Sequence, residues 1–219
     1  MRTRNDDGHP RGVPLHNFNH SMFYWLMWSF CRFIRMFFFP LTVVGGENIP
    51  KTGAFIFASN HRSHLDPMIV PICTTRKICF VAKEELFQKQ PLGWILRHLN
   101  SIPIRRESAD HRAMKTVLNR LSGGTPVLIF PEGTRVVNEA ERQIQAGVGW
   151  ITLKAAVPVV PIYIEGTDKV LPPHAKKLTR HPVKITFGQP VTLTQIPPKE
   201  YQSASEAIMQ AILALSGNL

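Results

Sequence analysis

The stretch Asn60-His61-Arg62-Ser63-His64-Leu65-Asp66 joins an apolar run, Ala54 to Ala58, to the sequence Pro67-Met68-Ile69-Val70. The apolar run lies between a glycine and a serine–asparagine pair and is typical of a short buried strand. A proline directly after an aspartate is typical of the first turn of a helix. The seven residues therefore predict a strand-to-helix turn.

His61 and Asp66 can meet on such a turn, because the four residues between them can fold back. A carboxylate that accepts a hydrogen bond from one imidazole nitrogen orients the ring, and this suits a general base working near neutral pH. A simpler interpretation fits the same residues: His61 and His64 are ordinary loop histidines, and Asp66 is only a helix cap. The rest of the chain has to decide between them.

The composition predicts one globular domain with an anionic partner. The 219 residues are 44% hydrophobic, which is ordinary for a folded domain and argues against disorder. The formal charge of +11 indicates a nucleic acid, an anionic membrane surface or a phosphorylated substrate. The basic residues are scattered and no nucleic-acid-binding motif is present, which favours a membrane or a phosphate over nucleic acid. Three cysteines without paired spacing predict neither a disulfide framework nor a zinc site.

The N-terminal region predicts a loose polar tail at 1–20 and a membrane-associated helical segment at 21–40. Residues 22–39 are almost all apolar and aromatic. As one helix they would span about 27 Å, slightly less than a hydrocarbon core of about 30 Å. Ser29, Arg32 and Arg35 would form a narrow polar stripe, with Trp25 and Trp28 on nearly the same face. We therefore expect an amphipathic helix that lies in one leaflet, with a buried core helix as the alternative and no signal peptide.

Strands and helices alternate through residues 41–219. The unbroken apolar strands predict a single α/β domain with a largely parallel mixed sheet covered by helices on both faces. One expected strand is interrupted by Pro158 and Pro161, and one expected helix is capped by Ser108. The main strands are expected at 54–58, 77–81, 101–106, 127–130, 157–164 and 183–187, and the helices at 92–99, 108–121, 147–156 and 203–216.

Three polar clusters follow expected strands. They are the His61/Asp66 turn, the pair Arg105-Arg106, and the block Glu132-Gly133-Thr134-Arg135. Each alone also fits surface charge or a local ion pair, but ligands of open α/β folds bind outside the carboxyl ends of the strands. A base and a carboxylate beside several cations suit an acceptor that carries both a hydroxyl and a phosphate.

In this order, these motifs resemble the 1-acylglycerol-3-phosphate acyltransferase family. The resemblance covers about residues 40–195, and HxxxxD followed by FPEGTR about seventy residues later is its specific part. The motifs are Asn-His-x-Ser-x-x-Asp at 60–66, Lys-Glu-Glu-Leu-Phe at 83–87, Ile-Pro-Ile-Arg-Arg at 102–106, Phe-Pro-Glu-Gly-Thr-Arg at 130–135 and Val-Pro-Val-Val-Pro-Ile at 157–162.

The resemblance implies an enzyme that moves a fatty acyl group from acyl-CoA or acyl-carrier protein to the sn-2 hydroxyl of lysophosphatidate. His61 would be the general base, oriented by Asp66, and the substrate's own hydroxyl would be the nucleophile. No metal and no cofactor are implied beyond the thioester co-substrate. The residues implied to bind substrate are Lys83, Arg106, Glu132, Gly133, Thr134 and Arg135. Both lipids partition into membranes, so the expected location is the cytoplasmic face of the plasma or inner membrane.

Two departures and three alternatives accompany this interpretation. Arg105 stands where many relatives carry an acidic residue, and residues 136–147 lack the usual basic-then-Phe-Lys pattern apart from Gly147. Another lysolipid, such as a lyso-ornithine lipid or lysophosphatidylglycerol, is an alternative acceptor. A metal-dependent hydrolase using His61, His64 and Asp66 is a second alternative, although no further ligand follows at useful spacing. A membrane-binding protein with a decayed site is the third.

Overall fold

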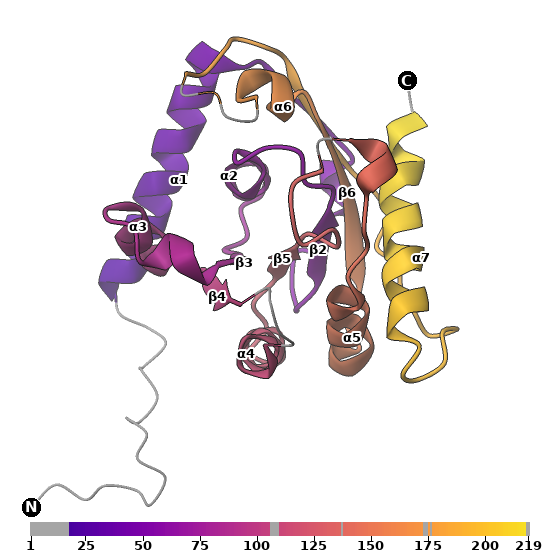
Figure 1. Cartoon of the computed structure of the whole chain (residues 1–219). Coiled ribbons are helices and arrows are strands. Elements are labelled where there is room, and N and C mark those ends of the chain that lie inside the picture. The colour runs from indigo at the N-terminus through magenta and orange to yellow at the C-terminus, as the bar shows by residue number, and fades with distance from the viewer. Residues whose placement is uncertain (1–17, 106–109, 137, 173–174, 176, 218–219) are drawn as a thin grey trace, which may run out of the picture.

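A computed structural model describes residues 18–105, 110–136, 138–172, 175 and 177–217 (Figure 1). The expected tail at 1–20 therefore lies almost entirely outside the described residues. The helices are α1 (Phe18–Phe38), α2 (Asp66–Ile72), α3 (Leu92–His98), α4 (His111–Ser122), α5 (Ala146–Ala155), α6 (Thr167–Val170) and α7 (Tyr201–Leu213). The strands are β1 (Leu41–Val44), β2 (Ile56–Ser59), β3 (Cys79–Lys83), β4 (Ile102–Ile104), β5 (Val127–Ile129), β6 (Val159–Glu165) and β7 (Val183–Phe187).

Within the described residues, the strands form one sheet of seven in the order β1-β7-β6-β2-β5-β3-β4. All neighbouring pairs are parallel except β6 and β7. This confirms the predicted α/β domain with a largely parallel mixed sheet. Because β2, β3, β4, β5 and β6 point the same way, their carboxyl ends, and the loops that follow them, meet at one edge of the sheet.

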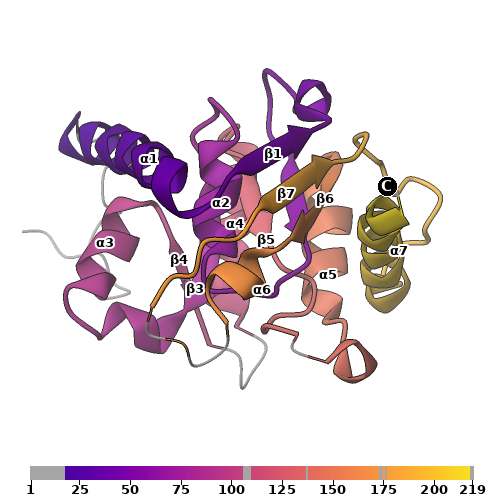
Figure 2. The same ribbon diagram turned by 90° about the horizontal axis from the view of Figure 1, so that it is seen from above.

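Successive residues of β2 point into two separate cores. Phe57 packs into a core that α1, α2 and α3 cover, whereas Ile56 and Ala58 pack into a core under α4, α5 and α7. All four residues of β2 are buried, as expected for a central strand covered on both faces. Figures 1 and 2 show the two groups of helices on opposite sides of the sheet.

Two local expectations were wrong. Strand β6 is continuous through Pro161, because the missing N–H of this residue lies on the edge of β6 that faces away from β2. On that edge β6 changes partner at Pro161, from Val191 to β7, so no ladder hydrogen bond from this position is lost. Helix α4 begins at His111 and is capped by Asp110, whose carboxylate accepts from the Ala113 N–H at 3.0 Å. The expected cap, Ser108, lies outside the described residues.

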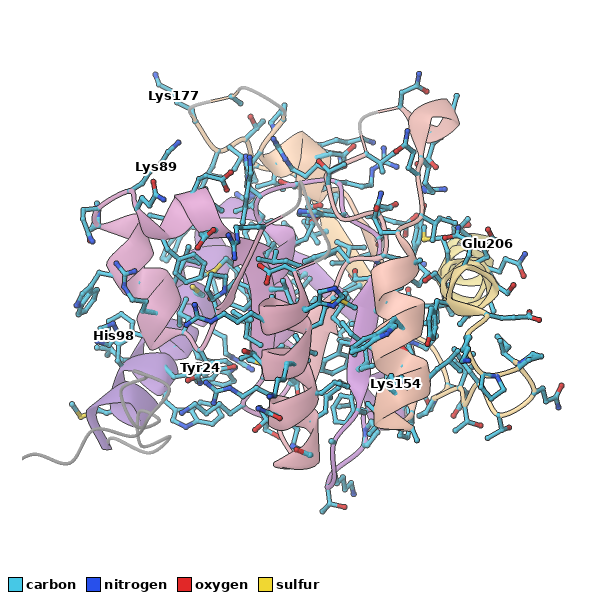
Figure 3. All side chains as sticks on the ribbon, turned by 60° about the horizontal axis from the view of Figure 1, so that its bottom comes forward. Tyr24, Lys89, His98, Lys154, Lys177 and Glu206 are labelled. Carbon is cyan, nitrogen blue, oxygen red and sulfur yellow. The ribbon has the colours of Figure 1, made fainter. Side chains whose placement is uncertain are left out.

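Helix α1 packs on the domain through Tyr24, Met27 and Trp28, with Arg32 of the polar stripe beside Trp28. The Trp28 indole donates to the Pro71 and Thr74 carbonyls at the end of α2, and Arg32 stacks on Trp28 with its guanidinium 4.5 Å from the ring centroid. The buried Tyr24 hydroxyl accepts from the Ile78 N–H at 3.2 Å. Phe23 reaches the neighbouring α3, where its ring centroid lies 5.2 Å from that of His98; Figure 3 labels His98 and Tyr24.

The opposite face of α1 is exposed and apolar. At 100° per residue its exposed residues share one side of the helix, and the polar ones with described side chains are Ser29 and, at the edge of that side, Arg32. Among the described residues, no helix is both long and apolar enough to cross a membrane. The exposed apolar side chains are Met22, Trp25, Leu26, Phe30, Phe33, Met36 and Phe37.

Candidate active site

The turn after β2 brings His61 and Asp66 into contact. The His61 Nδ1 and Asp66 Oδ2 atoms are 2.9 Å apart, and the two residues are 8% and 0% exposed. The same Oδ2 atom accepts from the N–H groups of Arg62 at 2.7 Å and Ser63 at 2.8 Å. One carboxylate oxygen therefore shapes the turn and also orients the imidazole. With a proton on Nδ1, the assigned tautomer leaves Nε2 as a proton acceptor.

Side chains of the turn anchor it to β6 and α6. The Asn60 amide donates to the Ile164 carbonyl at 2.9 Å and accepts from the Ile164 N–H at 2.7 Å. The Ser63 hydroxyl donates to the Leu171 carbonyl at 3.2 Å. These partners are main-chain atoms of β6 and of the residue that follows α6, so the turn has little freedom to open.

The loop after β5 supports His61 from the other side. The imidazole stacks on the Phe130 ring with centroids 4.1 Å apart. The His61 N–H donates to Glu132 Oε2 at 2.7 Å, and the His61 carbonyl accepts from the Val136 N–H at 2.8 Å. Two of the predicted clusters thus share one site, and the loop after β5 engages both main-chain polar groups of His61.

Glu132 is 2% exposed, and protein donors engage both of its oxygens. Burial raises the pKa of Glu132 above its usual value, against the opposing effects of the His61 N–H and the Arg142 guanidinium. This gives Glu132 a supporting role toward His61 that the sequence did not predict. Arg142 was also missed. Its only sequence signal is a lone cation in the segment that departs from the family pattern.

The remainder of the Glu-Gly-Thr-Arg block faces the outside of the same turn. Gly133 has φ 65°, a left-handed conformation that glycine adopts without strain. Thr134 is exposed and Arg135 is half-buried. Partial burial, then the charges of Arg135 and His61, lower the pKa of His64 and favour its neutral form. The charge of Arg135 therefore acts on the turn that carries His61 and His64.

The other predicted cations follow β3 and β4. Lys83 ends β3, and its Nζ lies 3.1 Å from Glu85 Oε1. Arg105 lies 3.6 Å from Glu84 and 3.8 Å from Asp110. The two cations are exposed, so solvent screens their pairs and they can be exchanged for a ligand, although the Asp110 side chain itself is only 8% exposed. Arg106 lies outside the described residues. Within the part of the chain that the structure describes, no three His, Cys, Asp or Glu side chains are grouped as for a metal ion.

The fold and this site define an α/β protein with a buried histidine–aspartate pair at the carboxyl ends of the strands. The histidine can accept a proton, and basic side chains follow the neighbouring strands. The chain belongs to the Acyltransferase family, whose model matches residues 40–165. Its structure is similar to the crystal structure of the 1-acyl-sn-glycerophosphate (LPA) acyltransferase PlsC from Thermotoga maritima, with TM-score 0.73 and 24% identity over 94% of this chain and 85% of that one.

Two curated relatives are named 1-acyl-sn-glycerol-3-phosphate acyltransferases. A 1-acyl-sn-glycerol-3-phosphate acyltransferase of Bacillus subtilis is 29% identical over 183 residues, which are 81% of this chain and 88% of that protein. A chloroplastic 1-acyl-sn-glycerol-3-phosphate acyltransferase of Brassica napus is 27% identical over 158 residues, or 70% of this chain and 46% of that protein. The chain thus spans about half the length of some curated relatives that it matches.

Proposed function

We propose that this protein transfers a fatty acyl group from acyl-CoA or acyl-carrier protein to the sn-2 hydroxyl of 1-acylglycerol-3-phosphate, giving phosphatidate. The observation that carries the proposal is the His61–Asp66 pair, in which Nδ1 is held at 2.9 Å by a buried carboxylate and Nε2 is left to accept a proton. The names of the relatives support the choice of acceptor.

The acyl transfer needs a base and then an acid, and His61 can be both. Nε2 takes the proton of the sn-2 hydroxyl as its oxygen attacks the thioester carbonyl. The tetrahedral intermediate collapses, the C–S bond breaks, and the imidazolium returns the proton to the leaving thiolate. Asp66 stabilises the imidazolium between these steps, because its charge lies against the other ring nitrogen.

The cations around the turn suit the phosphate of the acceptor. Arg135 can bind it through two parallel N–H donors, and the neighbouring Gly133 allows the main chain to come close. Arg106 is assigned the same role from its motif alone. Lys83 is the candidate for a second phosphate contact or for the thioester oxyanion. Glu132 and Thr134, the other two residues of the Glu-Gly-Thr-Arg block, complete the proposed binding region for the phosphate.

The protein would meet both lipids at the membrane surface. The apolar face of α1 includes Leu26, Phe33 and Phe37, each 60% exposed or more, and would bury them among acyl chains on the cytoplasmic side. A Phe33→Asp/Phe37→Asp variant should float less with vesicles. Gln210→Asp, on the exposed side of the distant α7, is the matched control. Equal flotation of all three proteins would contradict docking through α1.

The activity itself is tested with purified protein in mixed detergent–lipid micelles. Lysophosphatidate is supplied with acyl-CoA or with acyl-carrier protein, and phosphatidate is measured by mass spectrometry. Turnover with lysophosphatidate is expected. Turnover of lysophosphatidylglycerol or a lyso-ornithine lipid instead would keep the chemistry and replace the acceptor. No turnover of any lysolipid would contradict the proposed reaction.

A further inference from the structure

The segment that departs from the family pattern supplies the counter-ion of the active-site glutamate. Arg142 Nε lies 3.0 Å from Glu132 Oε1, and the side chains are 14% and 1% exposed. Arg142 also pairs with Glu139 through Nη2. The Coulombic attraction in a nearly dry pair of this kind is stronger than in a solvated one, and removing one partner leaves an uncompensated buried charge.

Glu132 passes this interaction on to His61. Its second oxygen, Oε2, accepts from the His61 main-chain N–H at 2.7 Å. Arg142 therefore contacts Glu132, and Glu132 in turn contacts the main chain of His61. Arg142 itself contacts neither His61 nor the reacting atoms, so any effect on the reaction has to pass through Glu132.

We propose that Arg142 is a positioning residue for acyl transfer: it keeps Glu132 ionised, and ionised Glu132 holds the main chain of His61 in place. This inference rests on the proposed role of His61 as the general base. Glu139, the second partner of Arg142, belongs to a further group of ion pairs near the surface, in which Arg62 bridges Glu139 at 2.7 Å and Asp168 at 3.3 Å. Glu139 is 54% exposed at its side chain, so we assign this group no part in the effect.

Burial makes the charge on Glu132 depend on Arg142. Desolvation raises the pKa of Glu132, and the charged or titratable groups that act against it are Arg142 and His61. Without Arg142, the carboxylate would be buried with a single main-chain donor, and its pKa would rise further. Removing an opposite charge at this range shifts a carboxyl pKa by about 1 to 3 units. A protonated Glu132 is a weaker acceptor for the His61 N–H, so the imidazole would lose its fixed position.

The kinetic test measures kcat/KM from pH 6 to 9 for the wild type and for Arg142→Met, with Arg112→Met on exposed α4 as the matched control. We expect Arg142→Met to lose activity at neutral pH and to regain it at alkaline pH, because the pKa of Glu132, raised by about 1 to 3 units, adds a new acid limb to the profile. Arg142→Lys, which keeps the charge, should restore part of the wild-type profile. A profile for Arg142→Met that is merely scaled down would overturn the proposal.

A second readout does not depend on activity. Thermal unfolding is followed at pH 5 and pH 8 for the wild type, Arg142→Met and Arg142→Met/Glu132→Gln. An ionised, unpaired Glu132 costs stability, so the deficit of Arg142→Met should be larger at pH 8 than at pH 5. The double variant has no carboxyl at this position to titrate, so it should lack the extra loss of stability that Arg142→Met shows at pH 8. Equal deficits for the single variant would also overturn the proposal.

The two readouts also separate this inference from the proposed reaction. The structural link predicts opposite trends for Arg142→Met, with activity rising toward alkaline pH while stability falls. If the wild type acylates no lysolipid, the proposed reaction fails while the unfolding comparison still tests the Arg142–Glu132 link. If the wild type is active and the profile of Arg142→Met matches the control, the inference alone fails.

Discussion

Asp66→Asn tests how the aspartate supports the histidine, because a single oxygen of Asp66 accepts all three of its hydrogen bonds. Asp66 Oδ2 accepts from His61 Nδ1 and from two main-chain N–H groups. The amide oxygen of asparagine can occupy this position and keep the three contacts. The variant should therefore retain the turn and the imidazole tautomer, and lose only the negative charge.

The magnitude follows from that charge. A hydrogen bond to a charged group contributes about 1.5–3 kcal/mol, and two unit charges about 4 Å apart at an effective dielectric constant of about 20 attract by about 4 kcal/mol. A loss of about 1.5–4 kcal/mol in transition-state stabilisation lowers kcat by roughly ten-fold to a thousand-fold. Asp66→Ala should be worse in two ways, because it also leaves three buried donors without their acceptor.

The assay measures kcat for lysophosphatidate acylation together with the unfolding midpoint of each variant. Asp66→Asn should unfold near the wild type, while Asp66→Ala should unfold at a clearly lower temperature. Activity of Asp66→Asn within three-fold of the wild type would refute the role of the charge. A fall of about ten-thousand-fold, as seen when a triad histidine takes the wrong tautomer, would refute the single-oxygen geometry.

Three further substitutions test the packing that supports the site. Trp28→Phe removes the indole donor to the Pro71 carbonyl, so thermal unfolding should show a loss of about 1 kcal/mol, and no loss would argue against this contact between α1 and α2. Gly93→Ala should cost about 1–3 kcal/mol in urea unfolding, because its new Cβ would lie 2.0 Å from the Phe87 carbonyl oxygen; an unchanged midpoint would contradict this close approach. Burial raises the pKa of Tyr24 from 10.0 to about 12, so Tyr24 should contribute about 3 kcal/mol to the fall in native stability as the pH rises through this interval. Tyr24→Phe should reduce the fall by that amount, while Cys73 and Cys79, whose pKa burial also raises to about 12, continue to contribute; an undiminished fall would argue against the buried hydroxyl.

The sheet was predictable from sequence because its strands are continuous apolar runs and its turns carry strong signals. The strand after Gly53, the proline after Asp66 and the motif at 130–135 each fix a junction locally. The predicted break at Pro161 was wrong, because the cost of its missing N–H depends on whether that N–H would face a neighbouring strand. Only the order of the strands supplies this information.

The active site was predictable as a set of motifs but not as a set of contacts. His61 and Asp66 are close in sequence, so their pairing followed from the turn. Glu132 was expected among the substrate-binding residues, yet its carboxylate also holds the His61 main chain, 71 residues away. Arg142 lies in a segment without a recognisable pattern, and its role arises only from the tertiary contact with Glu132. Long-range ion pairs leave no periodic signal in a single sequence.

The orientation of α1 shows the same limit. The arginine stripe was read correctly as one face of a helix, but periodicity does not say which face meets the protein. The structure turns Arg32 toward the end of α2, where its guanidinium donates to the Ile72 carbonyl at 3.3 Å. The aromatic face is then left outward. The helix packs on the domain through Tyr24, Met27 and Trp28, and its role at a membrane stays a prediction.

The most direct test of the account is the rate of phosphatidate formation by the purified wild type and by His61→Ala in the same lipid micelles. A general base contributes about a hundred-fold to ten-thousand-fold to such a reaction, so the variant should lose activity by that factor while its unfolding midpoint stays close to the wild type. Undiminished phosphatidate formation by His61→Ala would contradict the account.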